Sequence, residues 1–203
     1  MREFDALSAE KLRAELSPSI VGRQIVVLEE TTSTNESVLE RSSPSTPEGL
    51  VVFAECQTAG RGQRNALWES AAGKGLWFSI LLRPRIKIGD SPRLAEWAAR
   101  TIAETISEEL DVPASVKLPN DVVVAGKKIA GVLVEMRAQP NSPHIAIVGI
   151  GVNVNHQPED FSKELRPRAI SLAIALTRDI DRRQLAVALL RNLDRTYAET
   201  VGR

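Results

Sequence analysis

Residues 50–82 read LVVFAECQTAGRGQRNALWESAAGKGLWFSILL, and this stretch decides the fold. Its two ends, residues 50–56 and 76–82, are apolar runs with the length and composition of buried strands. Residues 57–75 between them contain four glycines and two arginines and show neither helical nor strand periodicity. We therefore predict a long loop held between two strands, an arrangement that often forms a ligand-binding lid.

On both sides of this stretch, the sequence mixes further strands with amphipathic helices. We predict strands at residues 24–30, 115–117, 121–124, 128–136 and 144–154, and helices at 5–16, 33–41, 90–110 and in two patterns within 167–200. Ser33 and Glu36 have the spacing of a capping box, which predicts that a helix begins there. This order favours an α/β or α+β fold, a mixed β-sheet with helices packed on it.

The composition restricts the class of protein. The chain has 203 residues, of which 43% are hydrophobic, and its 26 basic and 26 acidic side chains give a net charge of zero. This length suits one domain, and the neutral balance argues against a protein that binds DNA through its phosphates. No apolar run approaches the ~20 residues that span a bilayer, and residues 1–16 contain no apolar core of signal-peptide length. We expect a cytoplasmic protein without a DNA or membrane partner.

Few residues are available for metal or thiol chemistry. Cys56 is the only cysteine, and His144 and His156 are the only histidines. An internal disulfide, a Cys-rich zinc site and a three-histidine site are therefore excluded. Because Cys56 ends an apolar strand, we interpret it as a small buried hydrophobe, and a Cys–His nucleophile is the less favoured alternative.

Four segments place polar residues where a packed core has no use for them. They are residues 32–35 (TSTN), 57–68, 117–121 (KLPND) and 149–155 (GIGVNVN). In the second segment, glycines let backbone N–H groups approach an anion, arginines add positive charge, and Trp68 offers a flat face for a base. Taken singly, the four also fit an N-cap, a solvated loop, a surface hairpin and a β-bulge.

Together and in this order, the polar segments resemble the signature of biotin protein ligases. The resemblance rests on Ser33-Thr34-Asn35, Gln57-x-x-Gly60-Arg61-Gly62, Lys117-x-Pro119-Asn120-Asp121, residues 128–135 (KIAGVLVE) and Gly149-Ile150-Gly151-Val152-Asn153. It covers residues 25–197 and implies a fold similar to the catalytic core of class II aminoacyl-tRNA synthetases. It also implies that biotin and ATP form biotinyl-5′-AMP, and that biotin then passes to one lysine of a biotin carboxyl carrier protein of acetyl-CoA carboxylase.

The resemblance further implies roles for individual residues. Arg61 and Lys117 are expected to be catalytic, because cations must overcome the repulsion between a carboxylate and a triphosphate, with Mg²⁺ bridging phosphates. The expected biotin site comprises Ser33, Thr34, Asn35, Gln57, Gly60, Arg61, Gly62, Gln63, Lys117 and Gly131. The expected ATP or adenylate site comprises Arg61, Arg64, Trp68, Lys117, Asn120 and Asn153, without a cluster of metal-binding side chains.

The chain departs from the family's pattern in its loop and in its extent. Gln63, Asn65 and Ala66 stand where many relatives have more arginine and glycine, which predicts weaker retention of the adenylate. We expect one catalytic domain over residues 1–203, with a short helical segment at 1–24. We expect neither the DNA-binding domain of repressor-type members nor the small C-terminal β-barrel that many members carry.

Two alternatives to a biotin ligase stay open. One is a lipoate or octanoate ligase or transferase of the same fold, and the other is a non-catalytic module that binds biotin or the adenylate. The sequence also leaves open whether the protein forms a homodimer.

Overall fold

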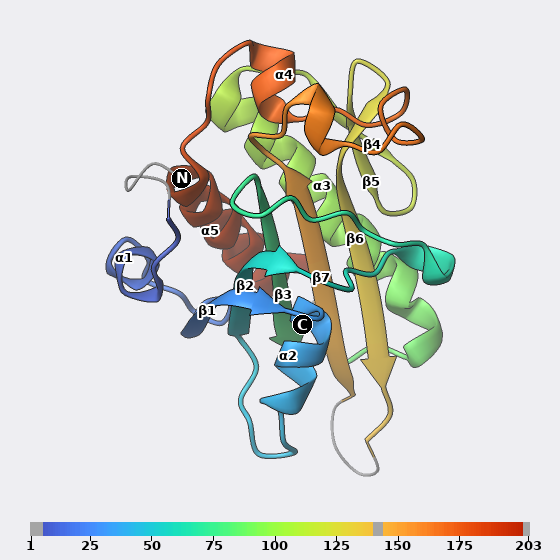
Figure 1. Cartoon of the computed structure of the whole chain (residues 1–203). Coiled ribbons are helices and arrows are strands. Elements are labelled where there is room, and N and C mark those ends of the chain that lie inside the picture. Colours follow the sequence, from blue (N-terminus) through green and yellow to red (C-terminus); the bar gives the residue numbers. More distant parts are fainter. Residues whose placement is uncertain (1–5, 140–143, 201–203) are drawn as a thin grey trace.

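A seven-stranded mixed β-sheet forms the centre of the structure, a computed structural model that describes residues 6–139 and 144–200 (Figure 1). The strands are β1 (Gln24–Thr31), β2 (Leu50–Gln57), β3 (Gly75–Leu82), β4 (Ala114–Lys117), β5 (Asp121–Val124), β6 (Lys127–Arg137) and β7 (Ile145–Asn153). Their order across the sheet is β1-β2-β3-β7-β6-β5-β4. β1 and β2 are parallel, and the other neighbouring strands are antiparallel.

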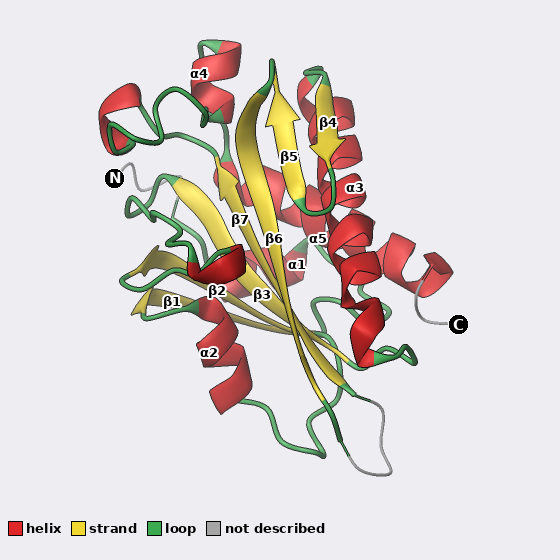
Figure 2. Cartoon of the chain, turned by 90° about the vertical axis from the view of Figure 1, so that its right-hand side faces the viewer, coloured by secondary structure: helices red, strands yellow, loops and turns green. Residues whose placement is uncertain are grey.

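Helices cover both faces of this sheet. They are α1 (Ala9–Ala14), α2 (Thr34–Glu40), α3 (Ser91–Leu110), α4 (Leu172–Leu176) and α5 (Arg182–Thr200), with 3₁₀ turns η1 (Gln63–Asn65), η2 (Ile88–Asp90) and η3 (Pro158–Asp160). Figure 2 shows α3 and α5 on one face of the sheet and α2 on the other. The main core lies beneath α3 and α5, and a smaller apolar cluster around Val38 lies beneath α2. The predicted mixed sheet with packed helices is therefore confirmed.

The alternation of side chains along the strands decides what faces α2. Ala130 and Val132 of β6, and Ile150 and Val152 of β7, point into the main core. The residues between them therefore face α2, and the register aligns them in one row across the sheet. That row pairs Trp77 with Gly151, Gly151 with Gly131, Gly131 with Asp121, and Asp121 with Lys117. The α2 face thus has two adjacent glycines near its middle.

The start of α2 differs from the prediction. Ser33 is the N-cap residue, but its hydroxyl makes no capping hydrogen bond, so the predicted capping box does not form. The backbone N–H of Thr34 instead donates to Oε1 of Gln57, 2.9 Å away on β2. Glu36 accepts a hydrogen bond from the Thr32 hydroxyl at 2.7 Å. A residue from a neighbouring strand, which no local pattern reveals, therefore caps the helix.

The loop between β2 and β3, residues 58–74, is called the lid loop below. In Figure 1 it crosses in front of β6 and β7, coloured teal to green. The predicted long loop between two strands is thus confirmed. Among the described residues, no helix combines the length and the apolar character needed to cross a membrane.

The burial of His156 predicts that stability depends on pH. It is 2% exposed and is stacked between Trp77 and Phe161, with ring centroids 5.5 and 5.0 Å away. Its pKa is lowered to about 4, mainly by burial and also by the nearby Lys74, while Asp160 and Glu69 act in the opposite direction. In the unfolded chain a histidine has a pKa of about 6.5. Between pH 6.5 and 4, the unfolded state therefore binds a proton at this histidine and the native state does not.

Stability should therefore fall by about 3 kcal/mol from this group as the pH drops from 6.5 to 4, and this contribution should be constant outside that window. Urea unfolding of the wild type and of His156→Phe, which keeps an aromatic ring, at pH 7 and pH 4 measures it. The variant should lose less stability than the wild type between the two pH values. Equal losses would show that His156 does not carry this dependence.

Candidate active site

A cavity opens on the α2 face of the sheet, over the two adjacent glycines. It encloses about 440 Å³, part of which is open to solvent. The residues that line it are Ser33, Thr34, Asn35, Gln57, Arg61, Gly62, Gln63, Trp68, Asn120, Lys128, Gly131, Val132, Leu133, Gly149, Ile150 and Gly151. All the polar segments singled out in the sequence contribute to this lining, although they are far apart along the chain.

Three glycines form the floor of the cavity, and each lies against a side chain. A Cβ atom on Gly149 would lie 2.3 Å from Oδ1 of Asn35. On Gly151 it would lie 2.5 Å from the Trp68 indole, and on Gly131 it would lie 2.9 Å from the same ring. The missing side chains thus let Asn35 and Trp68 lie directly on the strands.

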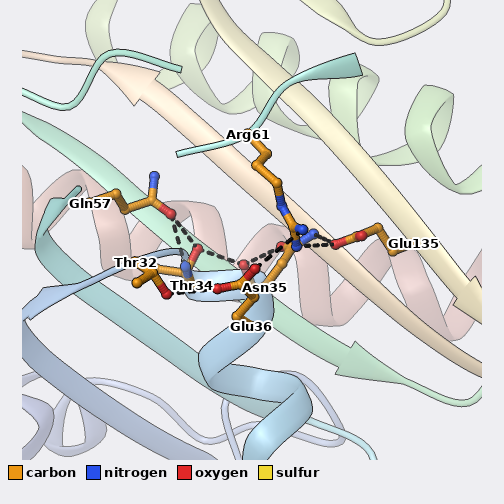
Figure 3. A network of polar contacts seen from close by, with 8 residues as sticks. Thr32, Thr34, Asn35, Glu36, Gln57, Arg61 and Glu135 are labelled. Atoms are coloured by element: carbon orange, nitrogen blue, oxygen red, sulfur yellow. Dashed lines mark hydrogen bonds and ion pairs between the residues drawn. The ribbon is translucent and has the colours of Figure 1, made fainter. Parts of the chain in front are cut away.

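A network of polar contacts joins the start of α2 to the lid loop (Figure 3). The Asn35 amide nitrogen donates to Oε2 of Glu135 at 2.6 Å. The Arg61 guanidinium contacts Glu135 and Glu36, each at 3.3 Å. These three charged groups are partly exposed, so each ion pair is weak, and an incoming anion can compete for Arg61.

Trp68 and Lys128 lie together over the glycine floor. Nζ of Lys128 is 5.1 Å from the centroid of the Trp68 ring, a cation–π contact, and 2.6 Å from Oδ1 of Asp121. Nε1 of Trp68 is buried and has no hydrogen-bond partner among the described residues. The cavity therefore holds a second cation besides Arg61 and a buried donor that a ligand could use.

Comparison with known proteins gives this cavity a context. The sequence profile of the Biotin/lipoate A/B protein ligase family matches residues 27–153. The chain belongs to this family. The Bifunctional ligase/repressor BirA of Bacillus subtilis (strain 168) is 36% identical over 193 residues, which are 95% of this chain and 59% of that protein. The Biotin--[acetyl-CoA-carboxylase] ligase of Mycobacterium tuberculosis is 34% identical over 181 residues, 85% of this chain and 63% of that protein.

The chain thus spans less than two thirds of the length of these curated relatives. Among solved structures, the biotin protein ligase from Aquifex aeolicus in complex with biotin and ATP superposes with a TM-score of 0.74 and 30% identity. The superposition covers 88% of this chain and 73% of that one. The expected biotin ligase fold, of the class II aminoacyl-tRNA synthetase type, is therefore confirmed.

Most residues expected to bind biotin line the cavity of the present chain. These are Ser33, Thr34, Asn35, Gln57, Arg61, Gly62, Gln63 and Gly131. Gly60 does not line it. A Cβ on Gly60 would lie 2.6 Å from the Trp68 carbonyl oxygen, so this glycine serves the close packing of the lid loop. Gln63 places a neutral side chain in the lining, and its effect on adenylate retention stays a prediction.

Only some of the residues expected to bind ATP line the cavity. Arg61, Trp68 and Asn120 line the cavity. Arg64 is exposed with a positive φ of 56°, and it does not line the cavity. Asn153 also lies outside the lining: it is buried, and its amide donates to the Ile170 carbonyl oxygen at 3.2 Å.

The structure places Lys128 in the lining of the cavity and Lys117 outside it. Lys117 shares the face and the row of Gly131, but it ends the edge strand β4, is exposed, and does not line the cavity. Lys128, which has no role among those that the family resemblance implies, supplies the cation there. Its place in the KIAGVLVE segment was the available signal. Regular alternation would turn Lys128 away from the face of Gly131, three residues later, but a bulge in β6 opposite Val122 and Val123 brings it to the cavity.

Two further features of the described residues are the side chains that could bind a metal ion and the thiol of Cys56. Among residues 6–139 and 144–200, no group of three or more His, Cys, Asp or Glu side chains is placed to hold a metal ion. Burial and the Glu30 carboxylate raise the pKa of the Cys56 thiol, which disfavours the thiolate. Cys56 is only partly buried, so the prediction of a buried hydrophobe is wrong in that respect, and its sulfur contacts the Ser70 carbonyl oxygen at 3.8 Å. The raised pKa still argues against the alternative of a nucleophilic thiol.

The glycine floor leads to a testable prediction. A methyl group on Gly149 would meet Asn35, whose amide is held by Glu135, so Gly149→Ala should destabilise the fold by about 1–3 kcal/mol through overpacking. Gly89→Ala is the matched control, because nothing lies within 4 Å of its added Cβ. Urea unfolding of both variants measures the difference. A Gly149→Ala protein as stable as Gly89→Ala would show that Asn35 is free to move.

Proposed function

We propose that the chain is an ATP-dependent biotin–protein ligase. The observation that carries this proposal is the pairing, in one cavity, of neutral polar groups with cations. Hydroxyl and amide groups of Ser33, Thr34, Asn35 and Gln57 gather near Gly149, which suits an uncharged urea ring. The ammonium of Lys128 lies near Gly131, which suits the carboxylate at the other end of biotin.

The proposed chemistry has two steps. In the first, the biotin carboxylate attacks the α-phosphorus of ATP, an acyl–phosphate bond forms, and pyrophosphate leaves. In the second, an uncharged lysine amine of the carrier protein attacks the biotinyl carbonyl and a C–N bond forms. AMP leaves with the bonding electron pair, and the amine nitrogen loses one proton to solvent. ATP would enter as its Mg²⁺ complex, in which the metal neutralises phosphate charge.

We assign the catalytic cations to Arg61 and Lys128. Two anions must approach each other in the first step, and a preorganised ammonium near both lowers the barrier to charge development. Lys128 meets this requirement by position, because it lines the cavity together with Arg61. The adenylate contacts expected for Arg64, Lys117 and Asn153 stay predictions, since none of these residues lines the cavity.

The cavity favours biotin over lipoate, which the family's range leaves open. Thr34, Asn35 and Gln57 already form hydrogen bonds within the protein. A dithiolane ring has no strong hydrogen-bonding groups, so it would leave unpaired the capacity that these side chains keep for a ligand, such as the second amide hydrogen of Asn35. An unpaired buried polar group costs about 1–3 kcal/mol. A site built from several such groups therefore discriminates against lipoate.

We infer the protein partner from the name of a relative. The Mycobacterium tuberculosis relative is named for acetyl-CoA carboxylase, which supports the carrier domain of that enzyme as the acceptor. A cytoplasmic location and a homodimer remain expectations that accompany this proposal.

Intact-protein mass spectrometry tests the proposed function. A biotin carboxyl carrier domain is incubated with the pure protein, ATP, Mg²⁺ and biotin, and a parallel reaction contains lipoate. We expect the carrier to gain one biotinyl group at a single lysine. Lipoylation without biotinylation would establish the alternative ligase, and biotin binding without pyrophosphate release would establish a non-catalytic module.

A further inference from the structure

Ser79 is a buried polar residue that the proposed mechanism does not use. It lies in β3, whose residues GLWFSILL are all buried, and it is 0% exposed. A hydroxyl in such a strand costs free energy unless it is hydrogen-bonded. Ser79 faces α2, because its neighbours Phe78 and Ile80 point into the main core. It therefore lies beneath the start of α2, next to the cavity rather than in its lining.

The hydroxyl of Ser79 contacts two residues that do line the cavity. Its Oγ is 2.6 Å from Oδ1 of Asn35 and 2.7 Å from Oγ1 of Thr34. The carboxamide oxygen of Asn35 can only accept, so the Ser79 hydroxyl donates to it. The Asn35 nitrogen, on the other side of the same group, donates to Glu135 at 2.6 Å.

These two contacts fix the orientation of the Asn35 carboxamide. If the group turned over, its oxygen would face the Glu135 carboxylate, which accepts hydrogen bonds but donates none. Its nitrogen would then face Ser79 in place of the oxygen. With Oδ1 held by Ser79 and one amide hydrogen bound to Glu135, the second amide hydrogen is what Asn35 can offer to a ligand. A carbonyl oxygen is the group that this donor suits.

We infer that Ser79 is a positioning residue that acts through Asn35. It sets the donor that the cavity presents to the carbonyl of a urea ring, and it thereby contributes to the recognition of biotin. This inference rests on the proposed function. It adds that specificity depends on a residue outside the cavity, and that the chemical group recognised through Asn35 is the ureido carbonyl.

Isothermal titration with biotin tests this inference. Ser79→Ala removes one oxygen and should raise the Kd for biotin about tenfold, the effect of losing one aligned hydrogen bond, while the KM for ATP should not change. Ser37→Ala is the matched control. That serine is also buried and bonds the Thr31 hydroxyl at 2.7 Å, but it does not line the cavity. Its Kd should equal that of the wild type.

A double-variant cycle separates positioning from a structural effect. If Ser79 acts through Asn35, then Ser79→Ala should have almost no further effect in an Asn35→Ala protein. Additive effects, or a Kd for Ser79→Ala within twofold of the wild type, would overturn the inference and leave the proposed function intact. Failure of the wild-type protein to bind biotin would instead overturn the proposed function itself.

Discussion

Lys128→Ala should lower kcat/KM for pyrophosphate release at least 100-fold, whereas Lys117→Ala should keep most of the activity. Removing one preorganised group that stabilises transition-state charge commonly costs about 100- to 1000-fold in rate. Lys128 lines the cavity beside Trp68, and Lys117 is exposed on the edge strand. Pyrophosphate release with biotin, ATP and Mg²⁺ measures both variants.

Lys127→Ala is the matched control for Lys128→Ala. It removes an equal charge from the adjacent residue of β6, but Lys127 does not line the cavity. Its activity should remain within a few fold of the wild type. If Lys117→Ala were inactive and Lys128→Ala active, the result would support the catalytic role predicted for Lys117 and contradict the one assigned to Lys128. Because the Lys128–Asp121 pair is partly exposed, its loss should change stability little.

Arg182→Ala should destabilise the protein by about 3–5 kcal/mol, the usual cost of breaking a buried ion pair. Arg182 is 0% exposed and donates to Oε2 of Glu55 at 2.7 Å and to the Gly75 carbonyl oxygen at 3.1 Å. Glu55 also accepts the backbone N–H of Leu7 at 2.9 Å. The variant would leave the Glu55 carboxylate without its charge partner in a site where water compensates poorly.

Thermal unfolding should show this loss as a fall in Tm of about 6–20 °C, given roughly 2–4 °C per kcal/mol for a chain of this size. Arg100→Ala is the control. It breaks an exposed pair with Glu96 at 2.7 Å, one helical turn away, and such pairs contribute less than about 1 kcal/mol. A similar Tm for both variants would mean that the Arg182–Glu55 pair does not stabilise the fold.

The central strands were predictable because their signals are local. Residues 50–56 and 76–82 are apolar runs that can only be buried, and the observed strands Leu50–Gln57 and Gly75–Leu82 agree with them. The helix predicted at 90–110 is observed as Ser91–Leu110, since its apolar stripe has helical period. The helix predicted at 5–16 is shorter, Ala9–Ala14, within the described part of that segment.

The sequence by itself determined which segments form the candidate site, because glycines, amides and cations in apolar surroundings stand out locally. Tertiary structure alone decided which lysine enters the cavity, which residue caps α2, and that Ser79 lies beneath Asn35. Lys117 and Lys128 both flank the β5 strand and look equivalent along the chain. They differ because β4 forms the edge of the sheet and β6 lies inside it, and strand order is set by pairing between residues far apart in sequence.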